Sequence, residues 1–262
     1  MERSAAYANL AKWFEYLNDD CDYENWSQYL IYKLKPFPLT KGIDIGCGGG
    51  WFTRAFTQAG YQMTGLDSSL QMLDFAQNQA LQTGQRGEYI LGDITSIKLP
   101  KRFDFATAIN DCINYIPKNK LSKAFKNIYA SLNQGGIFLF DISSIKKFNE
   151  KIANTVSVDD REDITYLCFN KLEGEKVTMD VTLFVKQLEG AYQRLDETHT
   201  QYLYSKQEIA SALQNAGFNL LEVTGHLGED ENASDRLCFL AQKGEKKMDV
   251  KIYNDKFELG KN

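Results

Sequence analysis

Apolar side chains in the first forty residues recur at helical spacing. The two repeating sets are Tyr7, Leu10, Phe14 and Leu17, followed by Tyr23, Trp26, Leu30 and Leu34. Recurrence every three to four residues is typical of an amphipathic helix with one buried face. Pro36 and Pro38 then end helical structure, because proline lacks a backbone donor and crowds the preceding turn. Residues 1–40 are therefore predicted to form a helical cover over another part of the chain.

From Lys41 onward, short apolar runs alternate with amphipathic segments. Strands are predicted over residues 43–45, 61–66, 88–91, 103–109 and 137–142. Helices are predicted over residues 51–59, from 70 to near 84, and 118–133, and Gly60 closes the first of them. Strands that alternate with helices imply right-handed crossovers and a parallel sheet covered on both faces.

Between residues 155 and 204 the pattern changes to three long strand-like stretches. Residues 173–175 and 189–191 join them, and each joint supplies a glycine where a hairpin needs a positive φ. The middle stretch, VTMDVTLFV, alternates cleanly between the two faces of a strand. We expect an antiparallel β insertion that serves as a substrate lid or a dimer element.

Helix–strand alternation resumes at Ser205. Ser205 and Glu208 form a capping-box pattern, and Gly217 marks the end of the helix. Two last strands are predicted over residues 218–225 and 236–242, paired antiparallel at the sheet edge, before a charged tail over residues 244–262. The fold class is α/β: a doubly wound, mostly parallel, seven-stranded Rossmann-like sheet formed by residues 41–154 and 205–243, with the antiparallel β insertion and the N-terminal helical cover.

Composition narrows the class of protein. Of the 262 residues, 43% are hydrophobic and 25% are charged, as in ordinary globular domains. The apolar runs are too short to cross a bilayer and no signal segment opens the chain, so no membrane partner is expected. Five cysteines without a CxxC spacing, and two histidines far apart, favour reduced thiols in a cytoplasmic protein without a metal.

Residues 41–60, KGIDIGCGGGWFTRAFTQAG, place four glycines between a strand and a helix. Such a turn lets the backbone approach a ligand closely and presents the free N–H groups of the helix N-terminus. A P-loop is excluded because no Gly-Lys pair follows the required spacing. The dinucleotide fingerprint needs a third glycine at position 51, where Trp51 is too bulky to pack against a pyrophosphate. A ligand that needs close backbone approach but has no pyrophosphate fits better.

The glycine turn resembles the first motif of the class I S-adenosylmethionine-dependent methyltransferases, D/E-x-G-x-G-x-G, which residues 44–50 match without a gap. The resemblance covers residues 41–142, and residues 205–242 in topology. It implies S-adenosyl-L-methionine as the cofactor and S-adenosyl-L-homocysteine as the product. The residues then expected to bind the cofactor are Tyr7, Trp26, Asp44, Gly46, Cys47, Gly48, Gly50, Asp67, Ser68, Met72, Asp93, Ile94 and Asn110.

Two acids at strand ends carry most of this expectation. Asp67 stands 21 residues after Gly46, where a carboxylate can accept hydrogen bonds from both ribose hydroxyls. The alternative for Asp67 is an acid at a helix N-terminus. Asp93 is expected to accept from the adenine amino group while Ile94 packs on the ring. In the resembled family the loop that holds Asn110 contacts the methionine part of the cofactor.

The same loop bears on the methyl acceptor. It reads Asn110-Asp111-Cys112-Ile113 and lacks the [DN]-P-P-[YFW] tetrad of enzymes that methylate nucleic-acid bases. Together with a net charge of −5, this argues against nucleic acid as a partner. The segments YANL, YENW and ETHTQYLYSKQEI resemble small-molecule N-methyltransferases of the amino-sugar and glycine/sarcosine types. The resemblance implies a small-molecule acceptor, methylated at an amine nitrogen.

Three residues are candidates for catalysis. His199 is the candidate general base because histidine titrates near neutral pH, and the alternative is an ordinary polar strand residue. Asp111 and Tyr115 are candidates for binding the acceptor. Arg54 is expected either to pair with the cofactor carboxylate or to lie solvated on its helix.

Two other functions stay open on the sequence. One is methylation of a protein or tRNA, which an open crevice lined with basic and aromatic side chains would favour over a closed pocket roofed by the insertion. The other is a non-catalytic S-adenosylmethionine-binding regulator. The insertion is also a candidate homodimer interface, because long antiparallel strands leave edges that must be covered.

Overall fold

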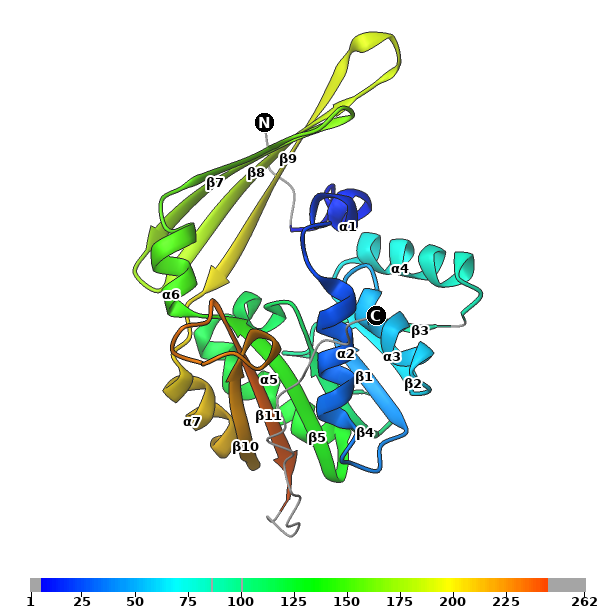
Figure 1. Ribbon diagram of the computed structural model, residues 1–262, viewed down its shortest axis with the longest axis vertical. Coiled ribbons are helices and arrows are strands. Elements are labelled where there is room, and N and C mark those ends of the chain that lie inside the picture. The colour runs from blue at the N-terminus through cyan, green and yellow to red at the C-terminus, as the bar shows by residue number, and fades with distance from the viewer. Residues whose placement is uncertain (1–5, 86, 100, 245–262) are drawn as a thin grey trace.

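Two β-sheets organise the chain. The computed structural model describes residues 6–85, 87–99 and 101–244, so the predicted charged tail lies outside the described residues from residue 245 onward. The larger sheet has seven strands in the order β10-β11-β5-β4-β1-β2-β3. These strands are β1 (Lys41–Ile45), β2 (Gln62–Asp67), β3 (Glu88–Leu91), β4 (Phe103–Ala108), β5 (Leu132–Ser143), β10 (Phe218–Gly225) and β11 (Arg236–Lys243). A smaller, four-stranded sheet projects from one end of this body (Figure 1).

The pairing of the larger sheet confirms the predicted fold class. Strands β1 to β5 pair in parallel, through β1–β2, β1–β4, β2–β3 and β4–β5. Strand β11 runs antiparallel between β5 and β10. The carboxyl ends of β1 to β5 therefore meet at one edge of the sheet, where ligands bind in open α/β folds.

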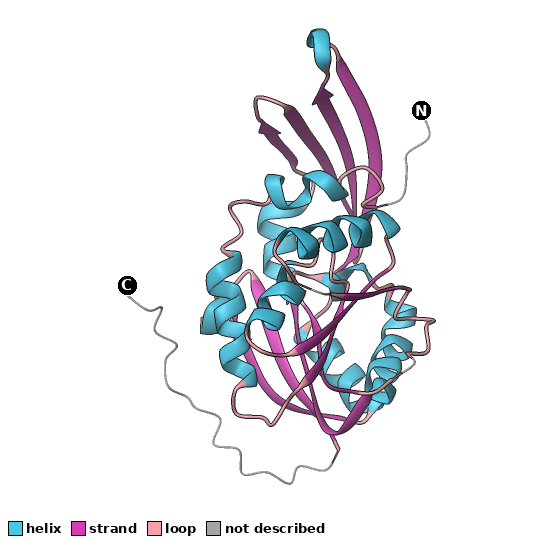
Figure 2. Cartoon of the chain, turned by 90° about the vertical axis from the view of Figure 1, so that its right-hand side faces the viewer, coloured by secondary structure: helices cyan, strands magenta, loops and turns pink. Residues whose placement is uncertain are grey.

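Helices cover both faces of this sheet, as Figure 2 shows. Helices α5 (Lys118–Ser131) and α7 (Lys206–Ala216) pack on one face, and α2 (Tyr23–Leu34) and α3 (Trp51–Gln58) on the other. Strand β5 is covered by helices on both faces, and for that reason its sequence is apolar on both faces. Phe138 and Phe140 enter the first layer, and Ile137 and Leu139 enter the second.

Local signals set several helix ends as expected. The Ser69 side chain caps α4 (Leu70–Gln82), which packs along β2 and β3. The capping box of Ser205 and Glu208 is present at the start of α7. Gly217 ends that helix with a φ of 100°, a left-handed conformation that glycine adopts without a Cβ penalty.

The insertion is an antiparallel meander, but it has four strands and not the three predicted. They are β6 (Val156–Asp160), β7 (Ile164–Glu173), β8 (Lys176–Lys186) and β9 (Tyr192–Tyr202), with η4 (Leu188–Gly190) before β9. The first stretch divides because the main chain turns at residues 161–163, where the Arg161 N–H donates to the Ile164 carbonyl. The sequence also did not predict α6 (Ile145–Lys147) and the π-helical turn η3 (Phe148–Ile152), which lead into the insertion.

The N-terminal segment differs from the predicted pair of helices. The first forms only η1 (Ala11–Trp13) and the single-turn α1 (Phe14–Leu17). Tyr7 has a φ of 62°, outside the right-handed helical region, and the main-chain N–H groups of Tyr7, Asn9 and Leu10 bond to the Glu197 carboxylate, which holds this stretch in a non-helical conformation. This segment packs on the β insertion, whereas α2 packs on the larger sheet.

Three observations bear on partners and cofactors. Among the described helices, none combines the length and the apolar character that crossing a bilayer requires. All five cysteines are free thiols. Within the described residues, no three His, Cys, Asp or Glu side chains gather in a way that could hold a metal ion.

Candidate active site

Two cavities adjoin at the end of the larger sheet where the parallel strands finish. The first, of about 570 Å³, lies against the glycine turn and the ends of β1, β2 and β4. The second, of about 1030 Å³, lies between this sheet and the inner side of the β insertion. Four residues line both cavities: Tyr7, Phe14, Asn110 and Tyr115. A molecule in one cavity would therefore meet a molecule in the other at these side chains.

The glycine turn forms the floor of the first cavity. Gly46 and Gly48 line it, and both adopt positive φ values, of 65° and 53°. A Cβ on Gly46 would lie 2.2 Å from Cys112 Sγ, so the close approach of two loops also requires glycine there. Gly50 does not line the cavity: it caps α3 with a φ of 81°, and a Cβ there would meet Ala76.

Trp51, which stands where a dinucleotide fingerprint has glycine, is part of the cavity wall. It is the first residue of α3, and its ring lies 5.0 Å from that of Tyr23. Both side chains line the first cavity. The tryptophan therefore contributes an aromatic surface at the position where a pyrophosphate would need close backbone contact.

Asp67 lies at the end of β2 and faces the glycine turn. Its Oδ2 accepts from the Gly48 N–H at 2.9 Å, and its Oδ1 accepts from the Ser69 N–H at 2.8 Å. Burial raises the pKa of this carboxyl, and the backbone hydrogen bonds oppose that effect. Each oxygen keeps a further lone pair, so the side chain can still accept from ligand hydroxyls.

The end of β3 supplies a polar and an apolar surface to the same cavity. Asp93 is exposed, and its two oxygens accept from the N–H and the hydroxyl of Thr95, both at 2.8 Å. Ile94 beside it is 6% exposed. Both residues line the cavity, and their contacts with adenine stay a prediction.

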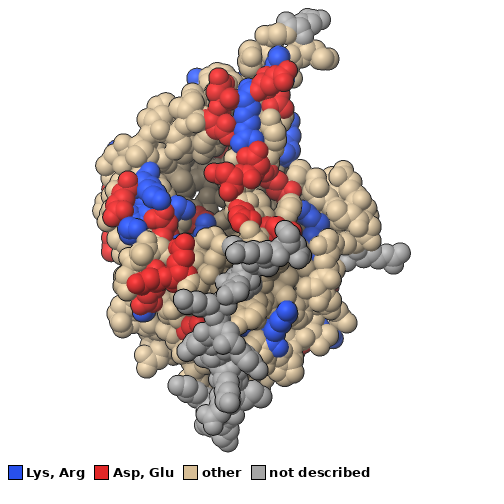
Figure 3. Space-filling model, viewed as in Figure 1, with Lys and Arg blue, Asp and Glu red and all other residues tan. Residues whose placement is uncertain are grey.

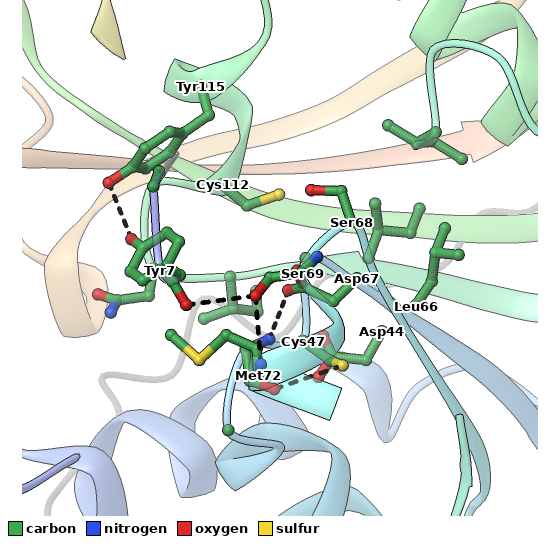
Figure 4. A pocket seen from close by; sticks show the side chains of 18 of the residues that line it. Tyr7, Asp44, Cys47, Leu66, Asp67, Ser68, Ser69, Met72, Cys112 and Tyr115 are labelled. Atoms are coloured by element: carbon green, nitrogen blue, oxygen red, sulfur yellow. Dashed lines mark hydrogen bonds between the residues drawn. The ribbon is translucent and has the colours of Figure 1, made fainter. Parts of the chain in front are cut away.

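Four more predicted residues line the first cavity: Asp44, Cys47, Ser68 and Met72. Asp44 accepts from the hydroxyls of Thr53 and Thr107 at 2.7 and 2.8 Å, and its burial raises the pKa of the carboxyl to about 6. The sequence reasoning missed Ser69, whose hydroxyl donates to the Tyr7 carbonyl and accepts from the Met72 N–H (Figure 4). Ser69 thus links the N-terminal segment to the start of α4.

The structure does not bring Trp26 or Arg54 to the first cavity. Trp26 is 1% exposed, stacks on Tyr29, and borders the second cavity beside the His226 ring, which is 4.4 Å away. Arg54 is neither solvated nor a lining residue: it is buried, donates to the Gly49 carbonyl and pairs with Glu15 at 3.1 Å. Helical spacing predicted that both residues lie on helices, but it did not predict which side chains they contact.

The loop after β4 joins the two cavities in an unusual backbone conformation. Asn110 and Asp111 are consecutive non-glycine residues with φ values of 63° and 53°. The buried carboxylate of Asp141 accepts from both of their N–H groups, at 2.6 and 3.0 Å. Arg236 pairs with that carboxylate and also donates to the Asn110 side chain. These contacts stabilise the loop in its left-handed backbone conformation. Asp141 is the one charged residue in the apolar run 137–142, a signal that could have identified it.

The second cavity contains the predicted catalytic residues. His199, on β9, is 3% exposed. Its Nδ1 lies 3.1 Å from the Tyr115 hydroxyl, and its Nε2 lies 2.6 Å from Glu197 Oε1. Asp111 accepts from the Gln201 side chain at 2.6 Å. Tyr115 lies in η2 (Cys112–Tyr115), directly after the loop that carries Asp111.

Sequence reasoning missed Glu197 and Gln201. Together with His199 they occupy alternate positions on β9, so all three side chains point to the same face. Buried polar residues at period two on a strand are a usable signal, because burial of such groups requires partners.

Charged side chains gather around the second cavity. Figure 3 shows a hollow bordered by carboxylates, with a group of Lys and Arg side chains on one side. Among the described residues that line it, the acidic ones are Asp20, Asp22, Asp111, Asp159, Glu229 and Asp235, and the basic ones are Lys146, Lys147, Lys151 and Arg236. The lining therefore carries more carboxylates than cations.

Comparison with known proteins agrees with this geometry. Residues 43–136 match the family described as methyltransferase domain. The chain is 32% identical to "Putative methyltransferase YqeM" of Bacillus subtilis (strain 168) over 245 residues, which cover 90% of this chain and 97% of that protein.

Two solved structures are similar over nearly the whole chain. The crystal structure of an S-adenosylmethionine-dependent methyltransferase from Clostridium acetobutylicum ATCC 824 is 28% identical, with a TM-score of 0.82, over 89% of this chain and 96% of that chain. The sugar N-methyltransferase KedS8 from Streptoalloteichus sp. ATCC 53650 is 16% identical, with a TM-score of 0.76, over 94% and 97% of the two chains, and shares the fold. The chain belongs to the family of class I S-adenosylmethionine-dependent methyltransferases.

Proposed function

We propose that this enzyme transfers the methyl group to an amine nitrogen of a small molecule bound in the second cavity. The observation that carries the proposal is the junction between the two cavities. Tyr7, Asn110 and Tyr115 border both of them, so cofactor and acceptor would meet at these side chains. Holding two reactants in line is the main task in such a displacement, and it can be worth about 7–11 kcal/mol.

The residues of the first cavity fit S-adenosylmethionine. The bare backbone of Gly46 and Gly48 permits close approach, Asp67 would accept from the ribose hydroxyls, and Asp93 with Ile94 would hold the adenine. When bound, the cofactor supplies a methyl group on a positively charged sulfur, already activated for displacement. The remaining work of the chain is to orient the acceptor, exclude water and take up a proton.

A small acceptor is favoured by the side chains that line the second cavity. Strands of the β insertion supply Tyr166, Met179, Val181 and His199 to its lining, opposite the loop at Asp111. These side chains form one wall of the cavity, so an acceptor has to fit between the β insertion and the larger sheet. The excess of carboxylates around this cavity favours a cationic acceptor such as an ammonium group.

Three residues have roles in this proposal. Asp111 would bind the acceptor amine. His199 would take up the proton of the amine. Tyr115, whose hydroxyl bonds His199 Nδ1, would connect the amine to His199. The fold accommodates such chemistry, since the similarly folded KedS8 is a sugar N-methyltransferase.

Calorimetry and a substrate screen test the proposal in order. S-adenosylmethionine and S-adenosylhomocysteine are titrated into the folded protein, and both should bind. Release of S-adenosylhomocysteine is then followed with panels of amine, hydroxyl and carboxyl metabolites, and the amine panel should give turnover. Absence of binding by both ligands would contradict the cofactor site, and turnover confined to hydroxyl or carboxyl acceptors would contradict N-methylation.

We also propose that the β insertion mediates a homodimer. Strand β6 is an edge of the smaller sheet, and Val156 and Val158 on it are 56% and 61% exposed. Phe169, the partner of Val156 on β7, is 49% exposed. Exposed apolar side chains beside an open strand edge are commonly covered by a second chain. Light scattering after gel filtration should give twice the chain mass, and a monomer at micromolar concentration would contradict it.

A further inference from the structure

A continuous chain of side-chain hydrogen bonds runs from the junction of the two cavities into the β insertion. The Tyr7 and Tyr115 hydroxyls lie 2.8 Å apart. Figure 4 marks this hydrogen bond with a dashed line. The Tyr115 hydroxyl lies 3.1 Å from His199 Nδ1, and His199 Nε2 lies 2.6 Å from Glu197. Tyr7 comes from the N-terminal segment, Tyr115 from η2, and the other two residues from β9. Glu197 has no part in the function proposed above.

Glu197 is a buried acid surrounded by donors. Its side chain is 1% exposed. Oε1 accepts from the Tyr7 N–H at 3.1 Å and faces His199 Nε2, and Oε2 accepts from the N–H groups of Asn9 and Leu10 at 2.9 and 3.1 Å. Burial raises the pKa of Glu197. The hydrogen bonds from His199 and from the backbone N–H groups lower the pKa by more than burial raises it, so the pKa lies below its ordinary value. The side chain is therefore an ionised acceptor.

An ionised Glu197 decides which nitrogen of His199 carries the proton. A carboxylate can only accept, so Nε2 must hold a hydrogen to make the 2.6 Å contact. In neutral imidazole the other nitrogen, Nδ1, then presents a lone pair, and the Tyr115 hydroxyl donates to it. Tyr115 oxygen in turn accepts from the Tyr7 hydroxyl. All three bonds consequently point the same way, from Tyr7 toward Glu197.

We propose that Glu197 is the positioning residue that orients His199 as a proton acceptor, and that Tyr7 and Tyr115 relay the proton of an ammonium acceptor to it. This inference rests on the proposed function. In the step, an N–H bond of the acceptor breaks and its proton passes to the Tyr7 oxygen. The Tyr7 hydroxyl proton moves to Tyr115, and the Tyr115 hydroxyl proton moves to His199 Nδ1. Both tyrosines end unchanged, the acceptor becomes a neutral amine, and His199 becomes an imidazolium paired with Glu197.

The surroundings of these hydrogen-bonded side chains favour passage of a proton through the two tyrosines over ionisation of either tyrosine. Burial raises the pKa of both Tyr7 and Tyr115, so their hydroxyls keep a proton and can only exchange it. The other titratable groups close by are Tyr166, Asp111 and, beside Tyr7, Asp67, and Arg236 lies 3.5 Å from Asp111. The carboxylate that contacts the imidazole ring is that of Glu197, and its negative charge stabilises the imidazolium form of His199.

The tautomer of His199 tests the proposal without knowledge of the acceptor. The chain contains only two histidines, so nitrogen-15 spectra of the full-length enzyme show two imidazoles, with His226 as the internal reference. His199→Gln assigns the signals. We expect His199 to carry its proton on Nε2 in the wild-type enzyme at neutral pH. A wild-type His199 protonated on Nδ1 would overturn the proposal.

Glu197→Gln should invert this tautomer. The amide has one oxygen and one NH₂, and each carboxylate oxygen now faces two N–H groups. The N–H groups of Asn9 and Leu10 both face Oε2 and cannot change, whereas Oε1 faces one backbone N–H, that of Tyr7, and His199, which can change. The NH₂ should therefore replace Oε1 and face Nε2, and the proton of His199 should move to Nδ1. Asp196→Asn is the matched control: it changes the neighbouring carboxylate, which bonds Thr182 and Arg194, and should leave the tautomer as in the wild type.

Activity and cofactor binding separate this inference from the proposed function. With the amine that gives the highest turnover in the screen, Glu197→Gln should lower kcat at least about tenfold and displace the acidic limb of the rate–pH profile. Tyr115→Phe should lower kcat similarly while His199 keeps its proton on Nε2. Because Tyr115 lines the first cavity and Glu197 holds the backbone of Tyr7, which also lines it, turnover of both variants is measured at saturating S-adenosylmethionine. Retained kcat in Glu197→Gln would overturn the relay, whereas loss of cofactor binding by the wild-type enzyme would overturn the proposed function instead.

Discussion

The Asp67 carboxylate bridges two loops, because its Oδ2 accepts from the Gly48 N–H at 2.9 Å while its Oδ1 accepts from the Ser69 N–H at 2.8 Å. One side chain at the end of β2 thereby positions the glycine turn and the start of α4. The ligand-facing backbone is held in place before any ligand arrives, which reduces the ordering cost of binding.

Asp67→Ala should weaken binding of S-adenosylmethionine and of S-adenosylhomocysteine alike, by about tenfold or more. Hydrogen bonds to a charged group are worth about 1.5–3 kcal/mol, and the substitution removes those to the ligand and to the turn. Isothermal titration measures both affinities. Asp74→Ala, at an exposed position on α4, is the control and should bind as the wild type does. Unchanged affinity in Asp67→Ala would remove the ribose assignment.

Gly46→Ala should destabilise the enzyme more than Gly48→Ala. Both positions have positive φ, which costs a non-glycine residue about 1–2 kcal/mol. A Cβ on Gly46 would also overlap Cys112 Sγ at 2.2 Å, whereas no atom lies within 4 Å of one on Gly48. Urea denaturation gives the two free energies of unfolding.

The cause of the Gly46 effect can be isolated with a second substitution. Cys112→Ala removes the overlapping sulfur, so the double variant Gly46→Ala/Cys112→Ala should recover part of the lost stability. Equal costs for the two single glycine variants would show that the Cys112 contact is not what requires glycine at position 46.

Asp44 should make the enzyme lose stability as the pH rises from about 4 to about 6. Its folded pKa is raised from 3.8 to about 6 by burial, so the folded state binds this proton more tightly than the unfolded state does. The favourable contribution is complete below the unfolded value and is lost as the pH passes the folded value. At about 1.4 kcal/mol per pKa unit, the loss is at most about 3 kcal/mol.

Asp44→Asn removes this ionisation while its amide can still bond Thr53 and Thr107. Thermal or chemical denaturation across this pH range should therefore give a flatter profile for the variant than for the wild type. Parallel profiles would mean that Asp44 ionises normally in the folded enzyme.

Glu15→Gln should cost about 1–3 kcal/mol of unfolding free energy. The substitution leaves Arg54, whose side chain is 9% exposed, without the carboxylate that pairs with it at 3.1 Å. Breaking a buried pair costs more than this, but Glu15 itself is 20% exposed and partly screened. Asp19→Asn, whose carboxylate is 63% exposed in its pair with Arg161, is the comparison and should cost less than Glu15→Gln. Similar costs for both variants would show that burial of Arg54 does not matter.

Much of the first cavity could be predicted because its residues lie at strand ends. Asp44, Gly46, Asp67 and Ile94 follow or close strands β1, β2 and β3, and parallel pairing brings those ends to one edge. Trp26 and Arg54 were placed wrongly because helical spacing reveals a buried face and not the surface it meets.

The sequence by itself determined the alternation of elements, the parallel sheet and the position of the glycine turn, since these follow from patterns a few residues long. Only the tertiary structure decided which residues from outside β9 meet His199 and Glu197. Tyr7 and Glu197 stand 190 residues apart, and nothing local in either segment specifies their contact. They meet because the N-terminal segment packs its apolar side chains against the β insertion, and that packing places its backbone donors at a buried carboxylate.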